Sequence, residues 1–321
     1  MKTRALTYVA PHQALLSDWE VPEMGEGKVR LRTLLSALSR GTERLIFEGR
    51  VPEGEFERMR APFQLGGFPF PVAYGYSAVS HVEEGPADLL GRTVFSLSPH
   101  QEIACLPVGA VIPLPDDLPA ERAVLAANME TALNAIWDAE LRPGSRVAIV
   151  GAGLLGCLIA GLLSRRTDLT VHVVDLLPQR SATLADFHVS FISTTEQSDS
   201  VETVFHTSAS AAGLQSAIDM LEFEGTVIEL SWFGAGPVEI DLGGAFHSKR
   251  LTIKASQVGH VAQSRRASTS HRQRLSLALD ALRDPRLDAF ITEEVAFDAL
   301  PGELSRLLGP GADGIATRIR Y

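Results

Sequence analysis

The sequence of 321 residues has only two cysteines, Cys105 and Cys157. Two thiols cannot form a disulfide framework or a four-cysteine zinc lobe, so both kinds of cross-linked fold are excluded. Basic residues number 29 against 39 acidic ones, which gives a formal net charge of −10. A nucleic-acid-binding protein normally carries a basic patch, so we expect no nucleic acid as partner. Repeats and low-complexity stretches are also lacking, whereas hydrophobic residues make up 45% of the chain, as in globular proteins.

A secretory signal is another feature that the sequence lacks, because its first ten residues, MKTRALTYVA, are too polar. We therefore expect a cytoplasmic protein with reduced cysteines. The longest apolar run covers residues 147–164. Its glycines divide it into a branched run, a turn and a leucine-rich run, which predicts a strand, a turn and a buried helix. We expect no membrane span there, although the run is almost long enough.

The chain is expected to be an α/β protein of two domains. Up to about residue 118, short branched runs separated by glycine and proline predict a β-rich, barrel-like domain, with strands at 28–34, 78–83, 93–97 and 110–114. After a helical stretch at 120–140, strands and helices alternate, which predicts a parallel sheet covered on both faces. We assign residues 1–118 and 259–321 to the β-rich domain and residues 119–258 to the inserted α/β domain.

The alternating part has expected strands and helices of similar size. The strands are predicted at 146–150, 171–175, 189–192, 203–206, 226–231 and 251–255, and the helices at 154–165, 213–221 and 272–282. A polar strand at 316–321 is expected to return to the first domain.

A glycine-rich turn joins the first strand and the first helix of the α/β part. Its glycines have the G-x-G-x-x-G spacing, in which the first makes the turn, the second admits a pyrophosphate and the third lets helix and strand approach. The helix N-terminus also offers free N–H groups to phosphate oxygens. We therefore predict a dinucleotide site at Gly151, Gly153, Leu154, Leu155 and Gly156.

Asp175 follows the next strand, at the position of the acid that binds the ribose in such sites. Its carboxylate favours NAD over NADP, since it would repel a 2′-phosphate; the alternative is that it only caps the strand. Arg180 is a nearby cation that could bind a 2′-phosphate. Because ligands of open α/β sheets bind beyond the strand ends, we expect further cofactor contacts from Thr207, Ser208, Ser231 and Trp232.

Several segments together resemble the medium-chain dehydrogenase/reductase family over nearly the whole chain. Besides the glycine turn, they are SALSRGTE at 36–43, PVAYGYS at 71–77, NMETALNA at 128–135 and LTIKAS at 251–256. The first two are most similar to the bacteriochlorophyllide-dehydrogenase-like branch. The resemblance implies a GroES-like catalytic domain, a Rossmann domain, hydride transfer in the cleft between them, and a homodimer.

The catalytic zinc of many family members is not expected here. In those members a cysteine, a His-Glu pair and a second cysteine bind the metal. The matching residues are Ser39, Tyr76 with Ser77, and Ala127. Zinc prefers thiolate, imidazole or carboxylate ligands, so the resemblance implies a zinc-independent member.

The catalytic candidates are hydroxyl groups and one acid: Tyr76, Thr42, Ser39 and Glu130. A phenol at Tyr76 can donate a hydrogen bond to a developing alkoxide, although a pKa of about 10 would need lowering for it to act as a base. Thr42 matches, with an offset of one residue, the hydroxyl that relays protons in the family. The alternatives are that Tyr76 fills space, that Thr42 caps a turn and that Glu130 is a first-turn helix acid.

A substrate lid is one interpretation of the long loop 50–70. Its aromatic and basic side chains suit a planar or anionic substrate, and a packing or dimer patch is the alternative. We expect the substrate contacts to be Arg40, Arg58, Arg60 and Phe63. Arg40 and Glu43 could instead form a local ion pair, and we expect His100 to be solvent-exposed.

The sequence thus predicts reversible hydride transfer between NAD(H) and a secondary alcohol or ketone. One alternative is NADPH-dependent reduction of a C=C bond in quinones or enones. Another is a dinucleotide-binding redox sensor without turnover, because a fold does not fix a function.

Overall fold

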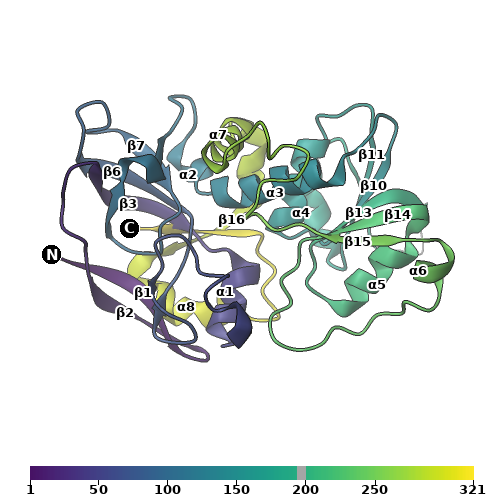
Figure 1. Ribbon diagram of the computed structural model, residues 1–321, viewed down its shortest axis with the longest axis horizontal. Helices are drawn as coiled ribbons and strands as arrows, with labels where there is room; N and C mark the ends of the chain where they lie inside the picture. Colours follow the sequence, from purple (N-terminus) through teal and green to yellow (C-terminus); the bar gives the residue numbers. More distant parts are fainter. Residues whose placement is uncertain (194–199) are drawn as a thin grey trace. The chain divides into compact units, whose positions relative to one another are not determined.

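The computed structural model describes residues 1–193 and 200–321. It divides into two compact units (Figure 1): the first comprises Met1–Ala127 and Ile291–Tyr321, and the second comprises Asn128–Phe290. The chain therefore leaves the first unit and later returns to it. Residues 259–290 lie in the second unit, whereas the sequence analysis assigns them to the β-rich domain.

The first unit contains two sheets. A four-stranded sheet has the order β2-β1-β5-β4, and a larger sheet has the order β16-β17-β3-β6-β7-β9, with β8 also paired to β3. Its strands are β1 (Lys2–Ala10), β2 (Gln13–Glu20), β3 (Lys28–Ala37), β4 (Leu65–Gly66), β5 (Val72–Ala73), β6 (Ala78–Glu84), β7 (Thr93–Ser96), β8 (Ile103–Pro107), β9 (Val111–Pro113), β16 (Ile291–Ala296) and β17 (Ala316–Arg320). The helices are α1 (Arg40–Phe47), α2 (Ala120–Ala123) and α8 (Leu300–Leu307). All four strands predicted in this part are confirmed.

The core of the larger sheet follows from the alternation of side chains along its strands. Successive residues of a strand point to opposite faces, so every second residue of β3 can be buried. Val29 and Leu31 are fully buried, and they pack with Val82, Val94 and Leu106 of neighbouring strands. This packing fixes the end of β3, from which the chain turns into α1.

The second unit is built on six parallel strands in the order β12-β11-β10-β13-β14-β15 (Figure 1). In chain order this is 3-2-1-4-5-6, the order of a Rossmann sheet. The strands are β10 (Arg146–Val150), β11 (Thr170–Val174), β12 (Ser190–Ile192), β13 (Val201–His206), β14 (Leu221–Glu229) and β15 (Thr252–Ala255). The helices are α3 (Ala126–Ala139), which begins in the first unit, α4 (Leu154–Leu163), α5 (Ala211–Asp219), α6 (Ala245–Ser248) and α7 (His271–Ala281).

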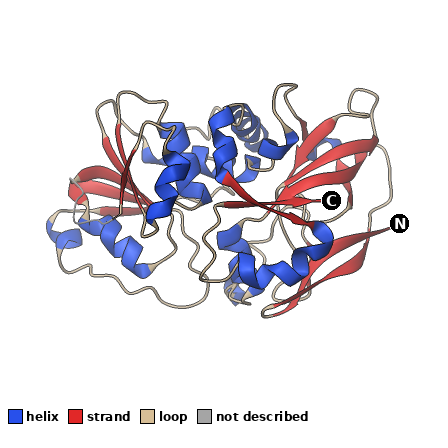
Figure 2. Ribbon diagram, turned by 180° about the vertical axis from the view of Figure 1, so that it is seen from behind, coloured by secondary structure: helices blue, strands red, loops and turns tan. Residues whose placement is uncertain are grey.

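Both faces of this sheet are covered. Ala148 and Val150 of β10 pack with Leu214 and Ile218 of α5, while the alternate residue Ile149 is also fully buried. Figure 2 shows helices on both sides of the strands of this sheet. The predicted doubly wound arrangement is therefore confirmed.

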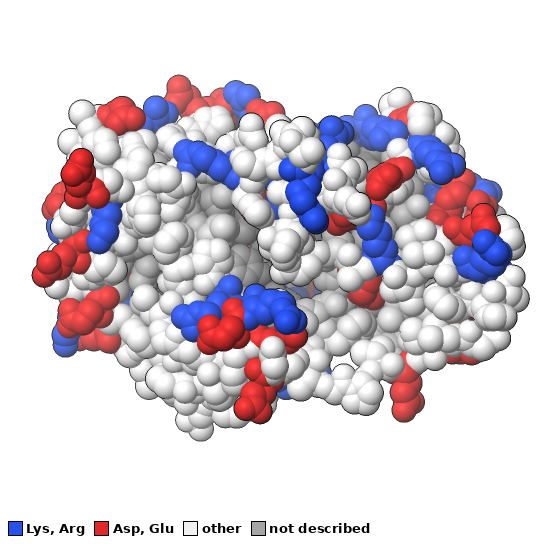
Figure 3. Space-filling view, in the orientation of Figure 1, with Lys and Arg blue, Asp and Glu red and all other residues white. Residues whose placement is uncertain are grey.

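The apolar run at 147–164 is divided between β10 and the ten-residue helix α4, as predicted. In the part of the chain that the structure describes, no helix combines the length and the apolar character that crossing a membrane requires. Figure 3 shows acidic and basic side chains mixed over one face of the molecule.

Candidate active site

Three hydroxyl groups meet beside the turn between β3 and α1. The Tyr76 hydroxyl donates a hydrogen bond to Ser39 Oγ and lies 3.2 Å from Thr42 Oγ1. Ser39 is the N-cap residue of α1, Thr42 lies in its first turn, and Tyr76 lies just before β6. The structure therefore brings together the three candidate catalytic residues of the first unit.

The phenol of Tyr76 is half-buried. Burial raises the pKa of Tyr76 to about 12, although its hydrogen bonds to Ser39 and Thr42 act in the opposite direction. A base near neutral pH would need a lowered pKa. Tyr76 is therefore protonated at neutral pH and suited to donating a hydrogen bond rather than to accepting a proton.

A buried carboxylate lies behind these hydroxyls. Glu43 Oε1 accepts a hydrogen bond from the Ser39 backbone N–H at 2.7 Å, and Oε2 accepts one from the Tyr8 hydroxyl at 2.8 Å. Glu43 Oε2 also lies 3.1 Å from His100 Nε2, and both side chains are 0% exposed. The expectation of an exposed His100 is therefore wrong, because the ring is buried against Glu43.

The other side of His100 continues the hydrogen-bonded cluster. Its Nδ1 lies 2.8 Å from Ser36 Oγ, which in turn lies 3.1 Å from the Tyr321 hydroxyl. Sequence reasoning missed this cluster, because its members come from β1, β3, α1, the loop before β8 and the residue after β17.

Acid titration tests the charge of this cluster. Burial alone would raise the pKa of Glu43, but the His100 ring and the hydrogen bonds from Ser39 and Tyr8 outweigh it and lower this pKa below its ordinary value of 4.5. A carboxylate with a lowered folded-state pKa contributes stability above its unfolded pKa, and this is lost as pH falls through the folded value. We expect the free energy of unfolding to fall below about pH 4.5.

The matched variant is Glu43→Gln, which cannot titrate. Urea unfolding of both proteins between neutral pH and about pH 3 measures the two acid slopes. The slope should be smaller in the variant, and equal slopes would contradict a charged Glu43.

The glycine turn of the second unit has the geometry that its spacing predicts. Gly151 has φ of +109°, a conformation that favours glycine, and its N–H donates to the Val174 carbonyl at 2.8 Å. A Cβ at Gly156 would lie 1.9 Å from the Gly151 carbonyl oxygen, whereas a Cβ at Gly153 would meet nothing within 4 Å. The turn is therefore tight on the strand side and open at Gly153. The predicted contacts Leu154 and Leu155 are half-buried in the first turn of α4.

Asp175 holds this turn from the end of β11. Its Oδ2 accepts hydrogen bonds from the Ala152 backbone N–H at 2.6 Å and from Arg180 Nη1 at 2.9 Å, while Oδ1 accepts one from the Leu177 N–H at 2.8 Å. The side chains of Asp175 and Arg180 are only 8% and 14% exposed. The acid and the cation singled out from the sequence therefore form one ion pair beside the glycine turn.

The carboxyl ends of β13 and β14 carry further polar groups. Thr207 Oγ1 donates to the Gly151 carbonyl at 2.8 Å, and His206 lies 2.7 Å from both Ser208 Oγ and Glu229 Oε2. Ser231 Oγ accepts from the Ala209 N–H at 3.1 Å. Thr207 and Ser208 thus lie beside Gly151, whereas Ser231 contacts Ala209 and His206. Trp232 is half-buried next to Ser231 in the chain.

Glu130 lies in a different environment within the second unit. Its Oε1 accepts a hydrogen bond from Arg274 Nε at 2.9 Å, and the two side chains are 6% and 1% exposed. Burial raises the pKa of Glu130, and the Arg274 guanidinium opposes that shift. Arg274 also donates to Asn134 Oδ1 and to the carbonyls of Val258 and His260. The contacts of Glu130 therefore join α3 to α7.

The three basic residues expected to contact substrate all donate hydrogen bonds to other residues of the first unit. Arg58 Nη1 donates to Glu55 at 2.7 Å, Arg60 Nη2 donates to the Gly66 carbonyl at 3.1 Å, and Arg40 Nη1 donates to the Gly314 carbonyl. Phe63 is 38% exposed and has φ of +58°. Within loop 50–70, Arg58 and Arg60 therefore bond to residues of the same loop.

Comparisons with known proteins agree with these two units. No family model matches the chain. A zinc-type alcohol dehydrogenase-like protein of Haemophilus influenzae is 23% identical over 222 residues, which are 64% of this chain and 60% of that protein. The match thus spans less than two thirds of this curated relative.

Solved structures match over the full length. An alcohol dehydrogenase from Escherichia coli CFT073 complexed with NADH has a TM-score of 0.77 at 15% identity and covers 100% of this chain and 99% of its own. The 2R,3R-butanediol dehydrogenase of Bacillus subtilis has a TM-score of 0.76 at 18% identity, with 99% of each chain covered. A dehydrogenase from Sinorhizobium meliloti 1021, bound to NADP, has a TM-score of 0.78 at 15% identity and full coverage of both chains. The chain has the medium-chain dehydrogenase/reductase fold. The predicted GroES-like β-rich domain and Rossmann sheet are therefore confirmed.

The positions at which the sequence resemblance implies zinc ligands do not carry suitable donors. At the corresponding positions, the Ala127 side chain has no ligand atom and Ser77 Oγ donates to the Val124 carbonyl. Tyr76 and Ser39, at the other two, are hydrogen-bonded to each other. Zinc prefers thiolate, imidazole and carboxylate, so this set does not fit the ion. Among the described residues, no cluster of three or more His, Cys, Asp or Glu could hold a metal.

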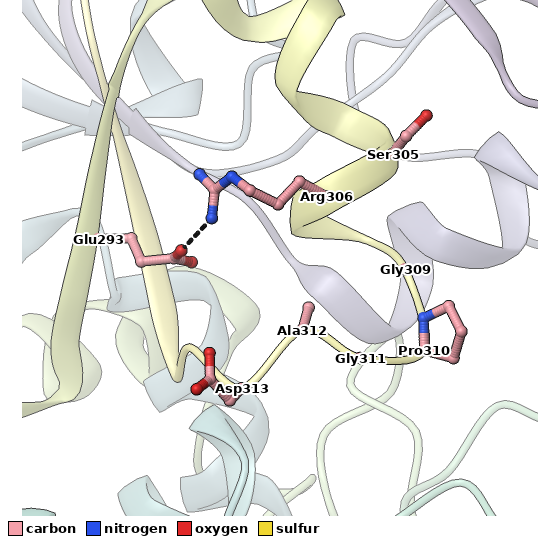
Figure 4. A pocket seen from close by; sticks show the side chains of 8 residues that line it. All are labelled: Glu293, Ser305, Arg306, Gly309, Pro310, Gly311, Ala312 and Asp313. Carbon is pink, nitrogen blue, oxygen red and sulfur yellow. Dashed lines mark hydrogen bonds and ion pairs between the residues drawn. The ribbon is translucent and has the colours of Figure 1, made fainter.

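A cavity of about 410 Å³ lies elsewhere on the first unit of this dehydrogenase fold (Figure 4). Glu293 and Arg306 face each other across it and form an ion pair at 2.6 Å, and the loop 309–313 closes one side. None of the predicted site residues lines it, so it carries no part of the site described above.

Proposed function

We propose that this chain is an NAD(P)-dependent oxidoreductase of the alcohol dehydrogenase type, with a secondary alcohol or ketone as substrate and no catalytic zinc. The observation that carries the proposal is the glycine turn, tight at Gly156 and open at Gly153, with the Asp175–Arg180 pair beside it. A pyrophosphate needs such an opening and the N–H groups of the helix behind it. The nicotinamide, when bound, supplies or accepts the hydride.

The chain's own contribution to the reaction is a hydrogen-bond donor. In the free protein the single proton of the neutral Tyr76 hydroxyl is donated to Ser39 Oγ. When substrate binds, this proton turns to the substrate oxygen and stabilises the charge that develops there, while the Ser39 and Thr42 hydroxyls donate to the phenol oxygen. For Glu130 we propose a structural role, because Arg274 occupies its carboxylate. Substrate contacts by Arg40, Arg58, Arg60 and Phe63 stay a prediction.

Fluorescence titration with NADH and with NADPH, on protein treated with a chelator, tests the proposal. We expect both to bind, NADH more tightly, and a panel of secondary alcohols to reveal turnover without added metal. Absence of binding would remove the proposal. Binding without turnover on any substrate would favour the redox sensor, and a stoichiometric zinc lost together with activity would contradict the zinc-free mechanism.

The choice between NAD and NADP depends on the Asp175–Arg180 pair. We propose a preference for NAD, because Asp175 stands where a 2′-phosphate would be repelled. Arg180 partly neutralises this carboxylate, so NADPH should still bind. In Arg180→Ala we expect NADPH binding to weaken about tenfold, the equivalent of one charge-assisted hydrogen bond, while NADH binding changes little. Equal weakening of both would show that Arg180 acts on the turn rather than on the phosphate.

A second candidate function follows from the same pair. Arg180 Nε is buried without a hydrogen-bond partner among the described residues, so Asp175 does not use all the donors of this guanidinium. That observation favours an NADPH-dependent reductase of activated C=C bonds. Tighter binding of NADPH than of NADH, with turnover of enones and not of alcohols, would support it.

A homodimer is also part of our proposal. β15 ends the order of the Rossmann sheet, and an edge strand presents backbone groups to which a second copy can pair. Light scattering during gel filtration measures the mass, and a monomer of 34.6 kDa would contradict the proposal.

A further inference from the structure

We infer that Glu43 and His100 are positioning residues: the buried Glu43 carboxylate caps α1 and so leaves the Ser39 hydroxyl available to Tyr76. The use of Tyr76 in catalysis rests on the proposed function. The arrangement of the cap does not, and it can be tested on the protein alone.

Serine caps elsewhere in the chain show what Ser39 does differently. An N-cap serine ordinarily accepts, through Oγ, the backbone N–H two or three residues later. Ser210 does this for Gly213 at the start of α5, and Ser270 does it for Gln273 at the start of α7. Ser39 is the N-cap of α1 but makes no such side-chain hydrogen bond. Its Oγ instead accepts from the Tyr76 hydroxyl.

The helix is capped by the acid instead. In the capping box of α7, the Gln273 side-chain oxygen accepts a hydrogen bond from the Ser270 N–H at 2.8 Å. Glu43 does the same for the Ser39 N–H at 2.7 Å, from one residue further along the helix. Of the two hydrogen bonds of a capping box, α1 therefore has only the one that the acid accepts from the N-cap N–H. The serine hydroxyl takes no part in it.

The position of Glu43 is fixed from the interior. A buried carboxylate is costly unless it is hydrogen-bonded, and the Tyr8 hydroxyl and His100 Nε2 meet its second oxygen. A solvent-exposed glutamine suffices for the box of α7, so stability alone does not require a buried acid here. The Glu43 carboxylate is therefore held in one orientation from the interior, and its other oxygen holds the Ser39 N–H.

His100 connects both partners of the hydroxyl pair. One edge of its ring meets Glu43, and its Cδ2 would lie 2.8 Å from a Cβ at Gly75, the residue before Tyr76. Its Nδ1 faces Ser36. The ring thus lies between the carboxylate that holds Ser39 and the backbone that carries Tyr76.

Tyrosine NMR provides a test that does not depend on turnover. The chain has four tyrosines, so labelling with [4-¹³C]tyrosine gives four signals, and Tyr76→Phe assigns the one of interest. We expect Glu43→Leu to move the Tyr76 signal to where Ser39→Ala moves it, because the freed hydroxyl then caps the helix. Combining both changes should add nothing. Glu43→Gln, whose carbonyl can still accept from the Ser39 N–H, should leave the signal in place.

A second variant covers the case in which Glu43→Leu fails to fold. Glu43→Asp keeps the charge but shortens the side chain, and we expect the same displacement of the Tyr76 signal. The inference is overturned if Ser39→Ala moves the Tyr76 signal whereas Glu43→Leu and Glu43→Asp both leave it unmoved. Where the leucine variant does not fold, an unmoved signal in Glu43→Asp is enough to overturn it.

Turnover separates this inference from the proposed function. On a substrate that the enzyme accepts, Ser39→Ala and Glu43→Leu (or Glu43→Asp, where the leucine variant does not fold) should lower kcat by factors within twofold of each other and leave KM unchanged. A KM effect without a kcat effect would contradict the positioning role. If no substrate is turned over, the proposed function fails, and the NMR comparison still decides whether Glu43 positions Ser39.

Discussion

Replacing Tyr76 with phenylalanine is expected to lower kcat by about 10²–10³-fold, with little change in KM or in NADH binding. The magnitude is that of removing one hydrogen-bond donor to a developing oxyanion, in the zinc-free site that we propose. Since the phenol is protonated at neutral pH, its loss removes the donor and not a base. Steady-state kinetics and an NADH titration on the same preparation measure the two effects.

Tyr74→Phe is the matched control for this substitution. The Tyr74 ring lies 5.8 Å from the Tyr76 ring, edge to face. The Tyr74→Phe substitution therefore removes a phenolic hydroxyl from the same cluster of aromatic rings. We expect near-normal kcat there. If the kcat of Tyr76→Phe is within twofold of the wild type, another group donates the hydrogen bond to the substrate oxygen.

Alanine at Gly156 or Gly153 is expected to abolish NADH binding, for different reasons. At Gly156 the new Cβ would lie 1.9 Å from the Gly151 carbonyl oxygen, so helix and strand must separate and the turn must open. Overpacking of this kind costs about 1–3 kcal/mol of stability. At Gly153 the Cβ meets nothing in the free protein but occupies the place of the pyrophosphate.

Stability separates the two variants. Because Gly153 is the N-cap of α4, alanine there costs about 0.5–1 kcal/mol, which urea unfolding distinguishes from the larger loss at Gly156. The fluorescence titration then measures NADH binding in both variants. Normal NADH affinity in Gly153→Ala would place the dinucleotide elsewhere on the chain.

Much of the fold was predictable because its determinants are local. The glycine turn at Gly151 depends on spacing within one strand and one helix, and Asp175 comes directly after the next strand. The branched runs at 28–34 and 78–83 likewise became β3 and β6. The helix α1 was not predicted, since its first turn contains Gly41 and Thr42, which both disfavour a helix; packing of Leu45, Ile46 and Phe47 stabilises it.

The polar interior was not predictable, because its partners lie far apart along the chain. Glu43 and His100 are separated by 57 residues, and Glu130 and Arg274 by 144. Taken alone, a histidine after a strand and an acid in a first helical turn are most often exposed. Only the tertiary structure shows that each is buried with a partner, and that Arg180 pairs with Asp175.

The strand β17 lies between β3 and β16, so the larger sheet of the first unit joins residues from both ends of the inserted unit. A growing chain that has reached residue 290 contains the whole second unit, whereas the first still lacks β16 and β17. Domains generally fold as units during synthesis, so the later-encoded unit can acquire its structure first. The hydroxyl cluster around His100, whose last member is Tyr321, is then among the last parts of the protein to form.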